Sequence, residues 1–284
     1  DPDDPPIIFL HGFPESHRTW RHQLSALSDN YFCIAPDQRG YRGSSKPSQV
    51  EAYTIDNLTA DVFALADAFG IEEFTIAGHD WGGAVAWSVA LNGQAGGFRP
   101  DFAGRVVRAM IANAPHPYIY QRSLIDDPVQ RAAAQYVRLF RDPACDAVID
   151  AGGLLALLEK AWGWQPSGKM ESYEAEDLIV GWGDRAAARG MVNWYRASQV
   201  VVPAIGEKAE MPEWAAGDFP LLEIPALVIW GMEDRALPPS NLDGIEALVR
   251  NVEIAPIPGC GHFVTWEDPE AVIAAMQSFL HRTN

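Results

Sequence analysis

The chain has 284 residues, of which 48% are hydrophobic and 21% charged, a composition typical of folded globular proteins that excludes wholesale disorder. Asp and Glu number 38 against 21 Lys and Arg, and the net charge of -17 repels phosphate backbones and anionic lipids, so we expect neither a nucleic acid nor a membrane partner. The 3 cysteines have no metal-ligand spacing, which predicts no metal site and free thiols in a reducing compartment, the cytoplasm.

Short apolar runs in the first and last parts of the chain are typical of strands buried on both faces of a parallel sheet. Helical patterns lie between these runs, and the alternation predicts right-handed βαβ units. In such sheets functional groups gather at the carboxyl ends of the strands. The predicted strands are residues 7–10, 31–35, 74–77, 106–112, 226–230 and, more weakly because Pro256 suits an edge, 252–257.

The middle of the chain has a different pattern. Residues 116–218 are rich in Trp and Tyr and show no clear strand pattern, whereas helical patterns occur at 128–140 and 153–161. This region is predicted to be a helical insertion between two halves of one sheet, placed as a lid over the strand ends. Charged residues of the insertion, such as Arg138 and Glu174, are expected on its solvated face.

The strongest local motif is Gly-His-Asp-Trp-Gly-Gly at residues 78–83, directly after a predicted strand and before a predicted helix. Its small residues allow a sharp turn that pushes Asp80 out of the sheet as a nucleophile, which is the G-x-S-x-G elbow with Asp in place of Ser. With this motif the chain resembles the α/β-hydrolase family, in particular its branch with an aspartate nucleophile. The resemblance runs from Ile7 to the C-terminus.

This resemblance implies an α/β-hydrolase fold, a mostly parallel sheet flanked by helices with an inserted helical cap. Residues 1–115 and 219–284 are then expected to form the core, and residues 116–218 the cap. The usual first two strands of the family would precede Asp1, so the chain is expected to begin near the third strand.

An aspartate nucleophile determines the expected chemistry. A carboxylate suits displacement at a saturated carbon, which gives an alkyl ester of the enzyme that water then hydrolyses. His262, in a Gly-Cys-Gly-His-Phe segment after the last predicted strand, is expected to activate that water as a neutral imidazole. Asp234 follows the preceding strand, and the order nucleophile, acid, base matches the family, so we expect it to orient His262. Glu233 competes for this role, and the resemblance favours Asp234.

Two further loops resemble those of the family. His-Gly-Phe-Pro at residues 11–14 is similar to the oxyanion loop, so the backbone N–H groups of Phe13 and Trp81 are expected to face the negative oxygen that forms during ester hydrolysis. Residues 37–45 also match a family loop but place Arg42 before the second glycine. We expect that loop to be structural.

Two segments of the predicted cap resemble those that carry the ring-opening tyrosines of soluble epoxide hydrolases. Residues 135–143 match a Tyr-x-x-x-Phe-x-acid-Pro pattern that begins at Tyr136, and residues 192–196 match an Asn-Trp-Tyr-Arg segment containing Tyr195. These matches imply that both tyrosines donate to the epoxide oxygen while Asp80 attacks a ring carbon. The implied function is hydrolysis of a small apolar epoxide by water to a vicinal diol, with no cofactor, and a homodimer stays open.

Two other classes of function stay open. A haloalkane or haloacid dehalogenase uses the same triad, and Trp81 is the residue with which haloalkane dehalogenases hold halide. Against this reading, Phe13 stands where those enzymes usually have Asn or Glu, and fluoroacetate dehalogenases usually have Arg after the nucleophile. The candidates for a second halide-binding indole are Trp162, Trp164 and Trp182. A catalytically silent protein that binds a small ligand is the third reading, and the intact triad argues against it.

Overall fold

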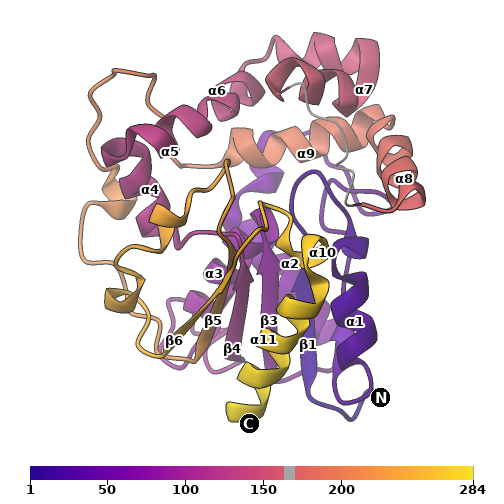
Figure 1. The fold of residues 1–284 in the computed structure, drawn as a ribbon, viewed down its shortest axis with the longest axis vertical. Coiled ribbons are helices and arrows are strands. Elements are labelled where there is room, and N and C mark those ends of the chain that lie inside the picture. The colour runs from indigo at the N-terminus through magenta and orange to yellow at the C-terminus, as the bar shows by residue number, and fades with distance from the viewer. Residues whose placement is uncertain (163–169, 284) are drawn as a thin grey trace.

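The computed structural model describes residues 1–162 and 170–283. Its centre is a six-stranded sheet in the order β2-β1-β3-β4-β5-β6, in which every neighbouring pair is parallel (Figure 1). Each predicted apolar run forms one of these strands, and the weakest run forms the edge strand β6. The strands are β1 (Pro6–Leu10), β2 (Phe32–Ile34), β3 (Phe74–His79), β4 (Val106–Ala112), β5 (Ala226–Gly231) and β6 (Val252–Ile257).

Helices cover both faces of the sheet and one of its ends (Figure 1). α1 packs with α11 on one face, α2 packs with α3 on the other, and the α4–α9 segment lies over the carboxyl ends of the strands. None of the described helices combines the length and apolarity needed to cross a bilayer. The helices are α1 (Arg21–Leu27), α2 (Ile55–Ala68), α3 (Trp81–Gly93), α4 (Pro117–Asp126), α5 (Pro128–Ala133), α6 (Gln135–Arg141), α7 (Cys145–Trp162), α8 (Ser172–Trp182), α9 (Arg185–Ala197), α10 (Val264–Glu267) and α11 (Pro269–Arg282).

The sheet separates two layers of apolar core, because alternate residues of a strand face opposite sides. Ile7 and Phe9 of β1 pack in a cluster with side chains of α1 and α11. Ile8 and Leu10 pack in a larger cluster with side chains of α2, α3 and the helices above the sheet. Burial on both faces explains why the strand sequences are continuous apolar runs rather than alternating ones.

The chain order creates a topological switch point between β1 and β3. From β1 the chain adds β2 on one side and then crosses back to β3 on the other. The loops that follow β1 and β3 therefore leave the sheet side by side at a topological switch point, where open α/β sheets bind ligands. These loops contain the predicted oxyanion residues and the predicted nucleophile.

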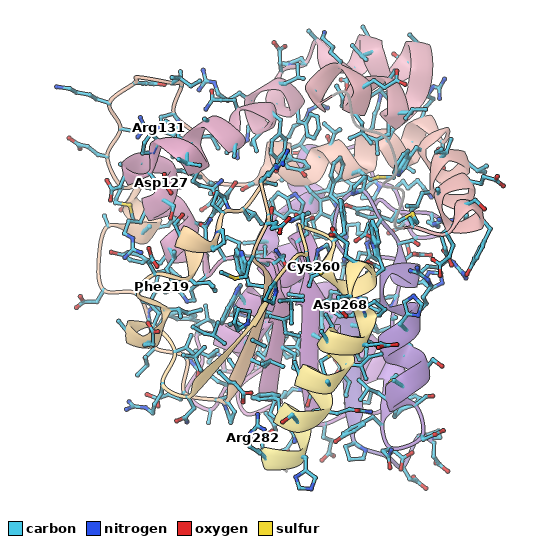
Figure 2. All side chains as sticks on the ribbon, viewed as in Figure 1. Asp127, Arg131, Phe219, Cys260, Asp268 and Arg282 are labelled. Carbon is cyan, nitrogen blue, oxygen red and sulfur yellow. The ribbon has the colours of Figure 1, made fainter. Side chains whose placement is uncertain are left out.

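The last helix has a stabilising residue at each end. Asp268 accepts a 3.1 Å hydrogen bond from the backbone N–H of Ala271, and Arg282 lies in the last turn at the opposite end of α11 (Figure 2). An acidic residue before a helix and a basic residue in its last turn both stabilise it, because their charges are opposite in sign to the nearby ends of the helix dipole. The loop between β6 and α10 carries His262, so the pairing of β6 with β5 fixes where that loop begins and the packing of α10 on α11 fixes where it ends.

The segment between β4 and β5 is helical, as predicted, and its described residues contain no strand. Two of its helices differ from the sequence pattern. Residues 128–140 fall in two helices, α5 and α6, separated at Ala134. Gly153 interrupts α7 with a φ of 73°, a conformation that glycine adopts without strain, so the predicted helix 153–161 is the later part of a longer element.

Ion pairs attach α8 to the loops of the sheet layer. Arg18 binds the Glu174 carboxylate through Nε, at 2.7 Å, and through Nη2. Arg42, in the loop at residues 37–45, binds Asp177 at 3.1 and 2.5 Å. The expectation that Glu174 lies on a solvated face is wrong, because its buried carboxylate pairs with an arginine distant in sequence, whereas Arg138 is exposed as predicted.

Candidate active site

Asp80 lies on a tight turn between β3 and α3. Its φ of 50° and ψ of -121° are values that residues other than glycine rarely adopt. The turn depends on two glycines, because a Cβ on Gly78 would lie 2.3 Å from the carbonyl oxygen of Gly82, and one on Gly82 would lie 2.3 Å from that of Leu10. This backbone has the strand–turn–helix form predicted from the motif, with Asp80 at the carboxyl end of the sheet.

The loop after β1 lies against this turn. A Cβ on Gly12 would lie 2.4 Å from the Cβ of Asp80, so glycine allows the close approach. The backbone N–H of the next residue, Phe13, donates a 2.6 Å hydrogen bond to Oδ1 of Asp80. Trp81 is the first residue of α3, where backbone N–H groups have no acceptor within the helix. Both predicted oxyanion residues therefore adjoin the Asp80 carboxylate.

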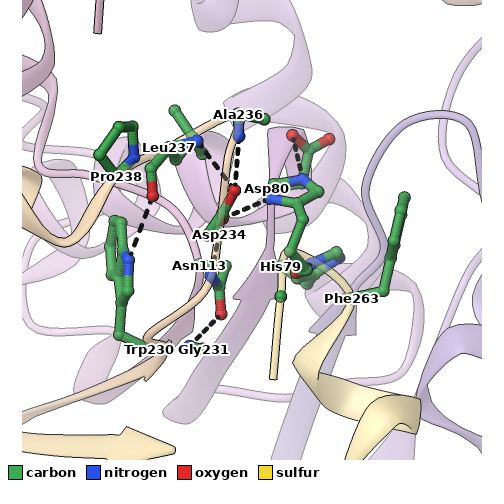
Figure 3. A network of polar contacts seen from close by, with 12 residues as sticks. His79, Asp80, Asn113, Trp230, Gly231, Asp234, Ala236, Leu237, Pro238 and Phe263 are labelled. Carbon is green, nitrogen blue, oxygen red and sulfur yellow. Dashed lines mark hydrogen bonds and ion pairs between the residues drawn. The ribbon is translucent and has the colours of Figure 1, made fainter. Parts of the chain in front are cut away.

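His262 and Asp234 approach the carboxylate from the loops after β6 and β5. Nε2 of His262 lies 3.2 Å from Oδ2 of Asp80, and Nδ1 lies 2.7 Å from Oδ2 of Asp234. Oδ1 of Asp234 accepts hydrogen bonds from the N–H groups of Ala236, at 2.8 Å, and Leu237, at 2.9 Å (Figure 3). The three residues predicted as a triad thus form one continuous chain of polar contacts.

Asn113, directly after β4, also holds Asp234, and sequence reasoning missed it. Its Nδ2 donates a 2.7 Å hydrogen bond to Oδ2 of Asp234, and its Oδ1 accepts one from the N–H of Gly231 at 2.9 Å (Figure 3). The available signal was its position at the end of a strand beside β5. Glu233, the competing acid, is exposed and takes no part in this network.

The charge of His262 is set by the carboxylates that face its two ring nitrogens. Burial lowers the pKa of His262, but the charge and hydrogen bond of Asp234, together with those of Asp80, raise this pKa well above its usual value. Burial raises the pKa of Asp80, but the hydrogen bond and charge of His262, with contributions from His79 and the Phe13 N–H, lower it overall. The resting site therefore pairs an aspartate anion with an imidazolium.

A cavity of about 110 Å³ opens beside this carboxylate. The rings of Tyr136, from α6, and Tyr195, from α9, both line it, and their centroids are 5.8 Å apart. Burial raises the pKa of both tyrosines well above its usual value, so their hydroxyl groups keep the proton that a donor needs. Much of the remaining lining is apolar: Trp81, Ala84, Pro115, Pro117, Val137, Val200, Val202, Ala236 and Leu237.

Of the indoles considered for halide binding, the structure describes the side chains of Trp81 and Trp182. Trp81 lines this cavity, but Trp182 does not, and Nε1 of Trp182 instead donates a 2.8 Å hydrogen bond to the carbonyl oxygen of Pro14. Trp164 and the side chain of Trp162 lie outside the described residues. The second indole that a dehalogenase would need is therefore not provided by Trp182.

A second carboxylate–histidine contact adjoins Asp80 and His262. His79, the residue before Asp80, places Nε2 2.8 Å from the carbonyl oxygen of His262 and Nδ1 3.2 Å from Oε2 of Glu15. Glu15 also accepts a 2.7 Å hydrogen bond from Nε1 of Trp266. Burial raises the pKa of Glu15, but its contacts with His79 and then Trp266 lower that pKa overall. Sequence reasoning missed this contact, which joins the loop after β1 to the backbone of His262.

We expect Glu15→Gln to lower the free energy of unfolding by about 3 kcal/mol near neutral pH, because it removes the charge from one side of a buried polar contact. The pKa of Glu15 is lower in the folded chain than its ordinary value of 4.5. The ionised carboxylate therefore stabilises the fold fully at pH values above 4.5, and this stabilisation is lost as the pH falls through the lower pKa of the folded chain. Urea unfolding at about pH 7 and about pH 3 measures the difference.

The exposed Glu210→Gln variant is the control for this substitution. It is expected to differ from the unsubstituted chain by less than about 0.5 kcal/mol at either pH. A Glu15→Gln deficit that is equally large at both pH values would show that charge is not its cause.

Comparisons with known proteins identify the class. The sequence pattern of the alpha/beta hydrolase fold matches residues 5–269, so the chain belongs to the alpha/beta hydrolase fold family, and the fold class predicted from the sequence is confirmed. The chain is 32% identical to AB hydrolase superfamily protein YfhM of Bacillus subtilis (strain 168), over 98% of this chain and 91% of that protein. It is 29% identical to Epoxide hydrolase A of Mycobacterium tuberculosis (strain ATCC 25618 / H37Rv), over 99% of this chain and 91% of that protein.

A solved structure is also similar to this chain over nearly its whole length. It is described among "Novel epoxide hydrolases belonging to the alpha/beta hydrolases superfamily in metagenomes from hot environments". Its TM-score to this chain is 0.92 at 54% sequence identity, with 99% of this chain and 92% of that chain covered.

Proposed function

We propose that this chain is an epoxide hydrolase that converts a small apolar epoxide to a vicinal diol through an ester on Asp80. The observation that carries the proposal is one cavity lined by the Asp80 carboxylate, by His262 and by the rings of Tyr136 and Tyr195. An attacking group and two donors are what the opening of a neutral ring needs. The relatives named epoxide hydrolases, at 29% and 54% identity, support the same reaction.

In the first step, Oδ2 of Asp80 attacks the less hindered epoxide carbon, and the bond between that carbon and the ring oxygen breaks. The ring oxygen takes a proton from Tyr136 or Tyr195. The resulting tyrosinate takes a proton in turn from the His262 imidazolium. Oδ1 of Asp80 becomes the carbonyl oxygen of the ester and keeps its hydrogen bond from the Phe13 N–H.

The second step needs His262 as a base. Esterification removes the Asp80 charge that helped raise the pKa of His262, so the neutral imidazole becomes accessible. Nε2 takes a proton from water, the hydroxide attacks Cγ of Asp80, and the charge on Oδ1 faces the N–H groups of Phe13 and Trp81. The bond between Cγ and the diol oxygen then breaks. That oxygen takes the proton of the new carboxylic acid, and the anion–imidazolium pair is restored.

Tyr136→Phe and Tyr195→Phe test the proposed ring opening. Each is expected to lower kcat/KM for styrene oxide by about 10²-fold, because each removes a donor to an oxygen that becomes negative in the transition state. The double variant is expected to lose more than either single variant. Steady-state kinetics measure these losses, and Tyr173→Phe, at an exposed position on α8, is the control.

Single-turnover kinetics separate this role from a merely structural one. The tyrosine variants are expected to slow formation of the ester and to leave its hydrolysis nearly unchanged, because the hydroxyl groups act on the ring oxygen. A double variant that retains the kcat/KM of the unsubstituted enzyme would contradict the proposed donors.

A further inference from the structure

Besides Ser198, two polar residues in the cavity wall have no part in the proposed reaction. Tyr120, from α4, and Arg141, the last residue of α6, line the same cavity as Asp80. The wall around them is largely apolar, with residues such as Val137 and Val200. Donors in an apolar wall are costly unless they meet an acceptor, which makes this pair a candidate for contact with the substrate.

The Tyr120 hydroxyl is an unused donor. It makes no hydrogen bond with any residue in the part of the chain that the structure describes. Burial raises the pKa of Tyr120 above its usual value, so the hydroxyl keeps its proton. The charge of Arg141 acts on this pKa in the opposite direction, which indicates that the two groups lie within electrostatic reach of each other.

The Arg141 guanidinium is held rigidly and still has donors to offer. Nε donates to the carbonyl oxygen of Tyr195 at 2.8 Å, Nη1 to that of Val200 at 2.8 Å, and Nη2 to that of Ser198 at 3.1 Å. One N–H on each terminal nitrogen remains without an acceptor among residues 1–162 and 170–283. No carboxylate in these residues forms an ion pair with Arg141, so its positive charge is not neutralised by the protein around it.

We propose that Tyr120 and Arg141 form a subsite for an acceptor oxygen on the substituent of the epoxide, so that epoxides with an ether or ester oxygen near the ring are the preferred substrates. This inference rests on the proposed function and narrows its substrate class. A neutral oxygen fits better than a carboxylate, because Asp80 is negative in the same cavity and the chain has a net charge of -17. The cavity of about 110 Å³ keeps that oxygen within a few bonds of the ring.

The test compares two epoxides that differ at one position. Phenyl glycidyl ether has an ether oxygen where 4-phenyl-1,2-epoxybutane has a methylene group. We define the oxygen preference of an enzyme as its kcat/KM for the ether divided by its kcat/KM for the carbon analogue. Because the oxygen preference is compared between each variant and the unsubstituted enzyme, the difference in intrinsic reactivity between the two epoxides cancels. A loss of activity caused by displacement of Tyr195 affects both epoxides and also cancels. The oxygen preference is expected to fall about tenfold in Tyr120→Phe and in Arg141→Met, as the loss of one hydrogen bond predicts.

Tyr118→Phe and Arg138→Met are the matched controls, because they change the same residue types on the same two helices but neither side chain lines the cavity. Both are expected to keep the unsubstituted preference. If both epoxides are hydrolysed but neither Tyr120→Phe nor Arg141→Met changes the oxygen preference, the subsite is overturned and the proposed function stands. If the unsubstituted enzyme hydrolyses neither epoxide, the proposed function itself is contradicted, and the subsite with it.

Discussion

Asp80→Ala is expected to abolish epoxide turnover, with a loss of about 10⁴-fold or more in kcat/KM. The reason is that Asp80 provides the only carboxylate among the described residues that line the cavity, so no other group there can form the ester. Water bound in the cavity is a poor substitute, because it lacks the negative charge of the nucleophile. Diol formation from styrene oxide, followed by chromatography, measures the loss.

Asp29→Ala, at an exposed position, is the control for this substitution and is expected to keep full activity. Thermal unfolding of both variants establishes that each is folded. A folded Asp80→Ala variant that still produces diol would contradict the covalent mechanism and would favour direct attack by water.

The sheet could be predicted from the sequence because its strands are buried on both faces, which makes each of them a short continuous apolar run. The helical segment was harder to predict. The break at Ala134 has no proline or glycine to mark it in the sequence, and Gly153 is one of two adjacent glycines in a pattern that otherwise reads as helix. The burial of Glu174 depends on Arg18, which lies 156 positions away, and local patterns carry no information about such pairs.

The residues of the candidate site were likewise predictable only in part. Asp80, Asp234 and His262 were identifiable because each follows a predicted strand, and parallel strands bring their carboxyl ends to one edge. The supporting groups were not identifiable. Asn113 contacts Asp234 across 121 positions. Glu15 lies 64 positions before its partner His79 and has no motif of its own. Such side chains act through contacts in space, and one sequence does not reveal these contacts.

The proposed mechanism gives His262 a role in the second step that no other described residue lining the cavity can fill. Its Nε2 lies 3.2 Å from Asp80, and glutamine at this position has no basic nitrogen to take a proton from water. His262→Gln is therefore expected to open the ring once and then stall, with the ester stable for minutes or longer. Its steady-state turnover is expected to fall by about 10³-fold or more. His281→Gln, at an exposed position, is expected to turn over normally.

The intact mass of His262→Gln after incubation with an epoxide tests the covalent mechanism most directly. We expect a gain equal to one whole epoxide molecule, located on Asp80 by peptide mapping and missing from the double variant that also carries Asp80→Ala. A parallel incubation with a bromoalkane distinguishes an epoxide hydrolase from a dehalogenase. A dehalogenase is expected to gain the mass of the alkyl group without its halogen. An adduct from bromoalkanes alone, or no epoxide adduct in a folded variant whose unsubstituted parent makes diol, would contradict the mechanism proposed for this chain.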